Sequence, residues 1–384
     1  MILQKYTSFK KSISNLSLSE LGLWLLIPFA SLTNVAGIPV SPTMLFLVGA
    51  VVCWTLLQMN GKLRIENREF KIVIVACLIF VAYLFASQYL MHAPFRRYIA
   101  AVMAPLFLVF ILIFSERVSG DFLKKIGRKF IHYSVIIFCV EVVFRFAMSF
   151  WKIAQDLSPY SSFYQFKFNA FIHGDSNFVA LLLVLLLFFM LWWKDRFKES
   201  LTKEIVIISI LIVLAFSRAA IPAAAVGLFY YFFFRNADWK KALAVALSVG
   251  IFGALALWAL RYFPDYSFQT KFLILDESLY YLRTADWKSI LFGIGFSKTE
   301  HIMTFGAHNY FLLYLLESGV IGLLLLCATL LVFIKVSNGK VMIVLLPFIV
   351  QAMAASTSFM PYLYVVIALM IIMNKPLLEN NVRS

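Results

Sequence analysis

Two arginines and one histidine are the residues of this sequence best suited to chemistry on an anionic substrate. Arg218 stands in a tight turn between two apolar runs, and Arg283 lies three residues before Asp286. The planar guanidinium group of arginine can bind phosphate oxygens through two parallel hydrogen bonds. His308 precedes Asn309 at the start of an apolar run, and an imidazole with an ordinary pKa of about 6.5 can remove a proton at neutral pH. These residues could bind a phosphate-bearing substrate and activate a hydroxyl group.

Each of these residues also has a simpler structural interpretation. Arg218 could anchor a helix end at the membrane surface, and Arg283 could form a local ion pair with Asp286. His308 could be an interfacial polar residue and Asn309 a helix N-cap. The residues alone leave both sets of interpretations open.

Further polar residues occur next to or inside apolar runs. Asp175 and Asn177 stand where one run begins, so helix capping explains them. Glu141 and Arg145 are four residues apart, a spacing that lets them pair on one helix face, as internal glue or as part of a substrate path. Glu317 lies inside a later run, before glycines that suit close helix packing. They are candidate supporting residues.

Several common catalytic signatures are absent from the sequence. It contains no GxxxxGK[ST] loop, HExxH, GxSxG or DxD pair. These absences argue against a nucleotide-driven pump and against a metal-dependent transferase. Cys53, Cys77, Cys139 and Cys327 lie inside apolar runs without metal-ligand spacing, so we expect packing roles and no metal or cofactor.

The composition defines the elements that must position these residues. Of the 384 residues 62% are hydrophobic and 14% charged, and the mean hydropathy is +0.89. A soluble domain has about half apolar and a quarter charged residues. The sequence therefore predicts an all-α polytopic membrane protein.

Spans of about 20 apolar residues cross a bilayer. The sequence contains about twelve candidate runs: Leu21–Val40, Met44–Met59, Phe70–Leu90, Tyr98–Phe114, Phe130–Phe150, Asn177–Trp193, Ile205–Phe216, Ala219–Phe234, Ala242–Leu260, Tyr310–Phe333, Val341–Ala355 and Met360–Met373. We expect one domain, residues 1–384, because the chain contains neither an internal repeat nor a linker. Two connections are long, Trp151–Ser176 and Arg261–His308, and long loops commonly carry function.

The net charge of +15 reflects the placement of lysine and arginine. About 23 basic residues fall in alternate connections and termini, which places these on the cytoplasmic side by the positive-inside rule. The charge is thus a signal of topology, and nucleic-acid binding is not expected. Both termini are predicted to be cytoplasmic, and 261–308 is predicted to be a periplasmic loop.

Four segments together resemble the O-antigen ligase and O-antigen polymerase superfamily. They are Gly174-Asp175-Ser176-Asn177, Ser217-Arg218-Ala219-Ala220, Arg283 with Trp287 before Gly293-Ile294-Gly295, and His308-Asn309 followed by Glu317-Ser318-Gly319 and Gly322. Their order and their placement around one long loop carry the resemblance, which covers roughly the second half of the chain.

The resemblance implies a metal-independent membrane glycosyltransferase with GT-C-type architecture in the bacterial inner membrane. Its donor would be an undecaprenyl-diphosphate-linked oligosaccharide, and its site would face the periplasm. By analogy, Arg218 and Arg283 would bind the diphosphate and His308 would deprotonate the acceptor. A chain-length regulator is a further partner that the resemblance allows.

Three functions remain open at this point. We favour a polymerase, whose acceptor is another lipid-linked glycan, over a ligase, whose acceptor is lipid A-core. A flippase for lipid-linked sugars would instead use Glu141 and Arg145 as its intramembrane site, but it predicts inverted repeats, and the sequence shows none.

Overall fold

The computed structural model describes residues 16–35, 38, 40–60, 65–155, 162–260, 266–304, 307–354 and 360–374. Over these ranges the chain is helical, and its extended pairings are two isolated bridges, Val35 with Ile172 and Ala170 with Gly174. The helices in chain order are α2 (Leu18–Leu26), α3 (Pro42–Met59), α4 (Arg68–Leu90), α5 (Phe95–Ser115), α6 (Gly120–Ala154), α7 (Ser162–Phe168), α8 (Ser176–Phe197), α9 (Thr202–Leu214), α10 (Ala220–Phe234), α11 (Trp239–Leu260), α12 (Tyr266–Thr284), α13 (Trp287–Phe292), the 3-10 turn η1 (Thr299–His301), α14 (Tyr310–Val336), α15 (Met342–Ala352) and α16 (Pro361–Met373).

The length and composition of the helices make this a membrane-embedded protein. Within the described ranges, 6 helices are long and apolar enough to cross a bilayer: α3, α4, α5, α6, α8 and α14. Large apolar side chains face outward around the bundle, among them Val143 at 70% and Phe233 at 72% exposure. Exposed apolar surface on this scale fits contact with lipid rather than water.

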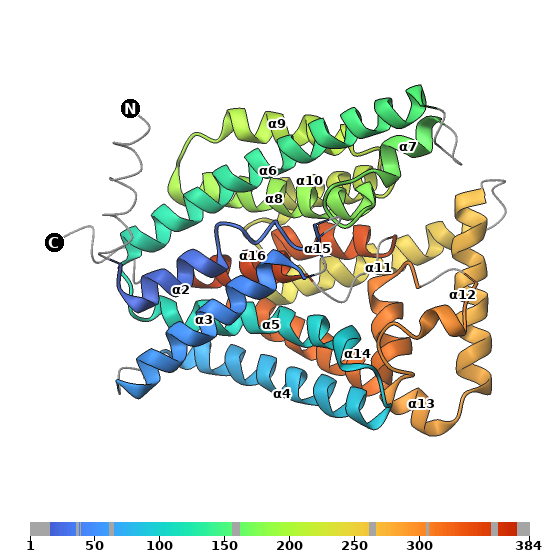
Figure 1. The fold of residues 1–384 in the computed structure, drawn as a ribbon, viewed down its shortest axis with the longest axis horizontal. Helices are drawn as coiled ribbons and strands as arrows, with labels where there is room; N and C mark the ends of the chain where they lie inside the picture. Colours follow the sequence, from blue (N-terminus) through green and yellow to red (C-terminus); the bar gives the residue numbers. More distant parts are fainter. Residues whose placement is uncertain are drawn as a thin grey trace.

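The long helices run along one axis of the molecule, and successive helices alternate in direction (Figure 1). One end of the bundle carries the helices α7, α12 and α13, which lie outside the long-helix layer. At this end, which we call the α12 end, α4, α6 and α9 finish and α5, α8, α10 and α14 begin. The residues with predicted chemical roles lie mostly at these helix starts.

Helices α8 and α16 form the centre of the bundle. Every residue of α16 is buried, and so is every residue of α8 from Val179 to Met190. Helix α16 has no charged residue in its sequence PYLYVVIALMIIM, and α8 is uniformly apolar from Phe178 to Trp193. A helix that is apolar on all sides belongs inside a bundle, where these two support the elements of the α12 end.

Local signals explain where the helices of the site begin. The side chain of Asp175 accepts a hydrogen bond from the backbone of Asn177 at the start of α8. Asn309 accepts from the backbone nitrogens of Phe311 and Leu312 at the start of α14. Both satisfy backbone N–H groups that have no partner within the helix, so capping is one role of each residue.

The predicted apolar runs correspond to helices with two differences. Of the run Leu21–Val40, the helix covers only the part to Leu26, after which turns lead to the bridge of Val35 with Ile172. The two long connections are not irregular, because the first contains α7 and the second contains α12, α13 and η1. The termini predicted to be cytoplasmic, residues 1–15 and 375–384, lie outside the described residues.

Candidate functional site

His308 is an exposed residue at the α12 end, directly before the cap of α14. Its neighbour Ala307 is buried in a small apolar cluster with Ile274 of α12 and Leu313 of α14. This cluster is separate from the main core and packs α12 against the start of α14. The imidazole is therefore held at the junction of two helices while its ring stays accessible.

Charges on three other elements act on the pKa of His308. Loss of hydration among the neighbouring protein atoms lowers the pKa of His308; the charge of Asp175 opposes this, and those of Lys167 and Lys271 add to it. Lys167 belongs to α7, Asp175 caps α8 and Lys271 belongs to α12. A lowered pKa leaves the imidazole mainly neutral at pH 7, the form that can accept a proton.

Arg218 is exposed in the turn between α9 and α10. Phe216 in this turn has a positive φ of 52°, which a bulky residue rarely adopts. The turn is fixed from one side, since the carbonyl oxygen of Leu214 accepts a hydrogen bond of 3.2 Å from Nη1 of Arg145. The backbone of the turn that carries Arg218 is thus held in place at the end of α9.

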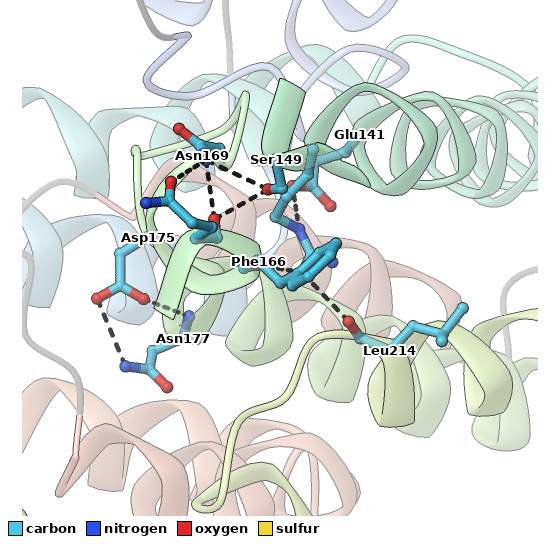
Figure 2. A network of polar contacts seen from close by, with 9 residues as sticks. Glu141, Ser149, Phe166, Asn169, Asp175, Asn177 and Leu214 are labelled. Atoms are coloured by element: carbon cyan, nitrogen blue, oxygen red, sulfur yellow. Dashed lines mark hydrogen bonds and ion pairs between the residues drawn. The ribbon is translucent and has the colours of Figure 1, made fainter. Parts of the chain in front are cut away.

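Glu141 and Arg145 form a buried ion pair on one face of α6, as their spacing suggested. Nε of Arg145 lies 3.0 Å from Oε1 of Glu141, and both side chains are 0% exposed. Nη1 of Arg145 also donates to the carbonyl oxygen of Phe166 at 2.7 Å, as well as to that of Leu214. The pair therefore joins α6 to α7 and to the end of α9 (Figure 2).

The same network continues through amide and hydroxyl groups near the end of α6. Asn169 donates to Oγ of Ser149 at 3.2 Å and to the carbonyl oxygen of Gln165 at 2.9 Å. Ser149 in turn donates to that carbonyl oxygen at 2.9 Å (Figure 2). These bonds fix the segment between α7 and α8, which leads to Asp175.

Arg283 is exposed in the last turn of α12. The predicted partner Asp286 is instead the N-cap of α13, and its carboxylate accepts from the backbone nitrogen of Ser289 at 2.8 Å. Arg283 follows Lys271 by twelve positions in α12, so the two residues are about 18 Å apart along the helix axis. His308 and Arg283 are therefore associated with opposite parts of α12.

Glu317 is buried inside α14, where its carboxylate binds another part of the protein. Its Oε1 accepts from the backbone nitrogen of Ser297 at 2.9 Å and from Oγ1 of Thr299 at 3.1 Å. This carboxylate holds the loop between α13 and η1. The structure thus gives Glu317 a supporting role, in which its carboxylate holds Ser297 and Thr299 in place.

His173 is a residue of the site region that the sequence did not single out. Its Nε2 lies 2.7 Å from Oγ1 of Thr33, and its Nδ1 accepts from Nδ2 of Asn34 at 3.1 Å. Burial lowers the pKa of His173 to about 4. The neutral ring of His173 therefore ties the segment after α2 to the chain just before Asp175. The sequence signal that could have identified His173 is its position directly before Gly174-Asp175.

Several buried polar side chains have atoms without a hydrogen-bond partner among the described residues, and we single out those of two serines and one glutamine. They are Ser176 at the start of α8, Ser217 beside Arg218, and Gln351 in the last turn of α15, where both amide atoms are unpaired. An unpaired buried polar group costs about 1–3 kcal/mol. Nothing in the apolar run around Gln351 indicated this placement.

No family model matches the sequence, and the curated proteins contain no match to it. The chemistry of the site therefore rests on its own residues. Within the described ranges, no three His, Cys, Asp or Glu side chains gather as metal ligands would. The charges that act on the imidazole of His308 are those of one carboxylate and two lysines, and a base beside positive charge is suited to proton transfer next to an anion.

Proposed function

We propose that this protein is a membrane glycosyltransferase that extends a lipid-linked surface polysaccharide. The observation that carries the proposal is the group of His308, Asp175, Lys167 and Lys271 at one end of a membrane-embedded bundle. It joins a base that is neutral at pH 7 to fixed positive charge at the same end of the helices. The donor is a glycan on undecaprenyl diphosphate, and the acceptor is the hydroxyl group of a second lipid-linked glycan.

The reaction is a single displacement at the anomeric carbon of the donor sugar. His308 takes the proton of the acceptor hydroxyl, and the acceptor oxygen forms the new bond to C1. The bond from C1 to the diphosphate oxygen breaks, and its electron pair stays on undecaprenyl diphosphate. Cations stabilise the negative charge that develops there, which is the role a metal ion plays in other transferases.

Arg218, Lys167 and Lys271 are the cations we assign to this diphosphate. Arg218 offers a planar fork for its oxygens, and the two lysines supply charge close to His308. Arg283 stays a predicted diphosphate ligand, but its distance of about 18 Å along α12 from Lys271 makes Lys271 the better-placed cation. Ser176, Ser217 and Gln351 supply polar atoms that have no partner within the described part of the chain, which suits a ligand rich in hydroxyl groups.

The proposal includes the orientation and architecture expected from the sequence. The basic residues of alternate connections would place the α12 end in the periplasm and both termini in the cytoplasm. The shorter helices would complete about twelve spans in a GT-C-type arrangement. Helix α9, with 13 residues, is about 20 Å long and would cross only together with its flanking turns.

A ligase and a flippase are the alternatives. A ligase would use the same base and cations with lipid A-core as acceptor. A flippase would need Glu141 and Arg145 as an intramembrane site, yet these side chains bond to each other and to the backbone of α7 and α9. This engagement favours a structural role for the pair.

The test is incubation of the purified protein with a lipid-linked oligosaccharide, with and without EDTA, followed by gel analysis of product length. We expect a ladder that persists in EDTA and disappears in His308→Ala, while binding of the donor persists because the base acts on the acceptor. Transfer only after addition of lipid A-core would indicate a ligase. Unchanged turnover by His308→Ala would refute the assignment of the base.

A further inference from the structure

Helix α14 is broken at Gly319, and the carbonyl groups before the break bond to other segments. Gly319 has φ 73° and ψ −180°, outside the helical region. The carbonyl oxygen of Leu316 accepts from the backbone nitrogen of Ile294 at 2.9 Å, and that of Glu317 accepts from the backbone nitrogen of Gly295 at 3.1 Å. A broken helix inside a membrane needs such replacement partners.

Helix α4 supplies the remaining partners. The hydroxyl group of Tyr83 donates to the carbonyl oxygens of Ser318 at 2.7 Å and of Leu291 at 3.2 Å. Gln88, which is 0% exposed, donates from Nε2 to the carbonyl oxygen of Glu317 at 3.1 Å. Its Oε1 accepts from the backbone nitrogen of Phe296 at 2.6 Å. Tyr83 and Gln88 therefore each contact both the broken helix α14 and the segment 291–299 that precedes it in the chain.

The loop itself fits the break closely. Gly293 has φ 81° and Gly319 has φ 73°, and a Cβ atom on either residue would collide with the backbone of the other segment. The carboxylate of Glu317 binds the next part of the loop at Ser297 and Thr299. Nζ of Lys298 reaches back to α4 at the carbonyl oxygen of Met91, at 2.9 Å. We call this assembly of α4, the loop 291–299 and the break in α14 the loop clamp.

We propose that Tyr83 and Gln88 are positioning residues that hold the segment from α12 to η1 against the membrane helices and so fix Arg283 and His308. The loop 291–299 of the clamp lies in the chain between these two residues, and the short first half of α14 connects the break at Gly319 to the cap at Asn309. Release of the clamp would free both the loop and this half-helix. The positioning role for catalysis rests on the proposed glycosyltransferase function, whereas the mechanical role of the clamp does not.

The mechanical role is tested by a distance measurement that needs no substrate. Spin labels are placed at Val75→Cys on α4 and Tyr280→Cys on α12, both exposed at 53% and 71%, in a protein whose native cysteines are replaced. We expect a narrow distance distribution with the intact clamp and a broad or displaced one in Gln88→Leu and in Tyr83→Phe. Gln58→Leu, an exposed glutamine of α3, is the matched control and should leave the distribution narrow.

The catalytic consequence is tested with the same variants in the polysaccharide ladder assay. We expect Gln88→Leu to lower kcat about tenfold or more, as misplacement of a catalytic group does, and Gln88→Glu, which retains an acceptor for Phe296, to recover part of the loss. An unchanged distance distribution in Gln88→Leu and Tyr83→Phe would overturn the proposal. A changed distribution with wild-type kcat would overturn the positioning role. If the wild-type protein makes no ladder, the proposed function fails while the distance result still decides on the clamp.

Discussion

The hydroxyl group of Tyr83 donates to the carbonyl oxygen of Ser318 at a distance of 2.7 Å, across 235 positions of the chain. Tyr83 belongs to the first half of the sequence, and Ser318 directly precedes the break in α14. The bond links α4, in which the sequence predicts no catalytic or binding residue, to α14, which begins beside His308. The positions of the candidate chemical groups therefore depend on both halves of the chain.

The charge of Asp175 should control the pH dependence of activity. Asp175 raises the pKa of His308 against the larger lowering caused by burial. Removing its charge in Asp175→Asn should lower that pKa further, so the acid limb of the rate profile should move to lower pH. Asparagine is also a good N-cap, so α8 should keep its start.

The measurement is the initial rate of chain extension from pH 4 to pH 8. Asp286→Asn, which alters the cap of α13, is the control and should keep the wild-type profile. A shift of the Asp175→Asn limb to higher pH, or none, would contradict the assignment of His308 as the titrating base.

Arg218 should not tolerate lysine. Lysine keeps the charge but cannot form two parallel hydrogen bonds to a phosphate. We expect Arg218→Lys to lower kcat/KM by about tenfold or more, corresponding to about 1.4 kcal/mol of transition-state stabilisation. Arg235→Lys, at a residue whose Nη1 lies 2.9 Å from Asp195, is the control. Wild-type kinetics in Arg218→Lys would return Arg218 to the role of a helix anchor.

The buried pair on α6 should contribute strongly to stability. Replacing Arg145 by methionine leaves the carboxylate of Glu141 buried without its partner, and such changes cost about 3–5 kcal/mol. Thermal unfolding in detergent should show a lower midpoint for Arg145→Met, and a smaller loss for Arg145→Met combined with Glu141→Gln. Lys125→Met, at an exposed position on α6, is the control. A loss in the double variant equal to the sum of the losses in Arg145→Met and in Glu141→Gln would show that the two side chains are not coupled.

His173 should make stability depend on pH. Its pKa falls from 6.5 to about 4 on folding, so the unfolded chain binds a proton that the folded protein excludes. Stability should therefore be complete above pH 6.5 and decline as the pH falls toward 4, by about 3 kcal/mol in total. The measurement is the unfolding midpoint between pH 7 and pH 4 in wild type and His173→Gln. The variant should lose less stability over this range, and an equal slope would argue against the buried neutral ring.

Much of the helical framework could be predicted from apolar periodicity and length. The run Asn177–Trp193 became α8 because uniformly apolar segments of this length satisfy their backbone internally. The helix predicted for the run Leu21–Val40 was too long. The second part of this run forms turns and pairs through Val35 with Ile172, a contact that hydropathy does not encode. The helix α12 was missed because its mixed polarity resembles that of a surface loop.

The sequence predicts the local roles of several site residues but not which of them the fold brings together. Asp175 and Asn309 are recognisable helix caps, and the spacing of Glu141 and Arg145 predicts their pairing. The proximity of Lys167 and Lys271 to His308 depends on how α7 and α12 fold over the helix starts, which no local pattern reveals. Two partners of the Gln88 side chain, the carbonyl oxygen of Glu317 and the backbone nitrogen of Phe296, lie more than two hundred residues away, so only tertiary structure identifies them.

The loop clamp has a consequence for the synthesis of the protein. Gln88 is synthesised early. The backbone nitrogen of Phe296, which donates to Oε1 of Gln88, is synthesised 208 residues later. Until that segment has left the ribosome, the Oε1 atom of Gln88 lacks its partner, and an unpaired polar atom is costly in hydrocarbon. A nascent chain stopped before Leu291 therefore exposes a polar defect in the bilayer, and completion of α14 removes it.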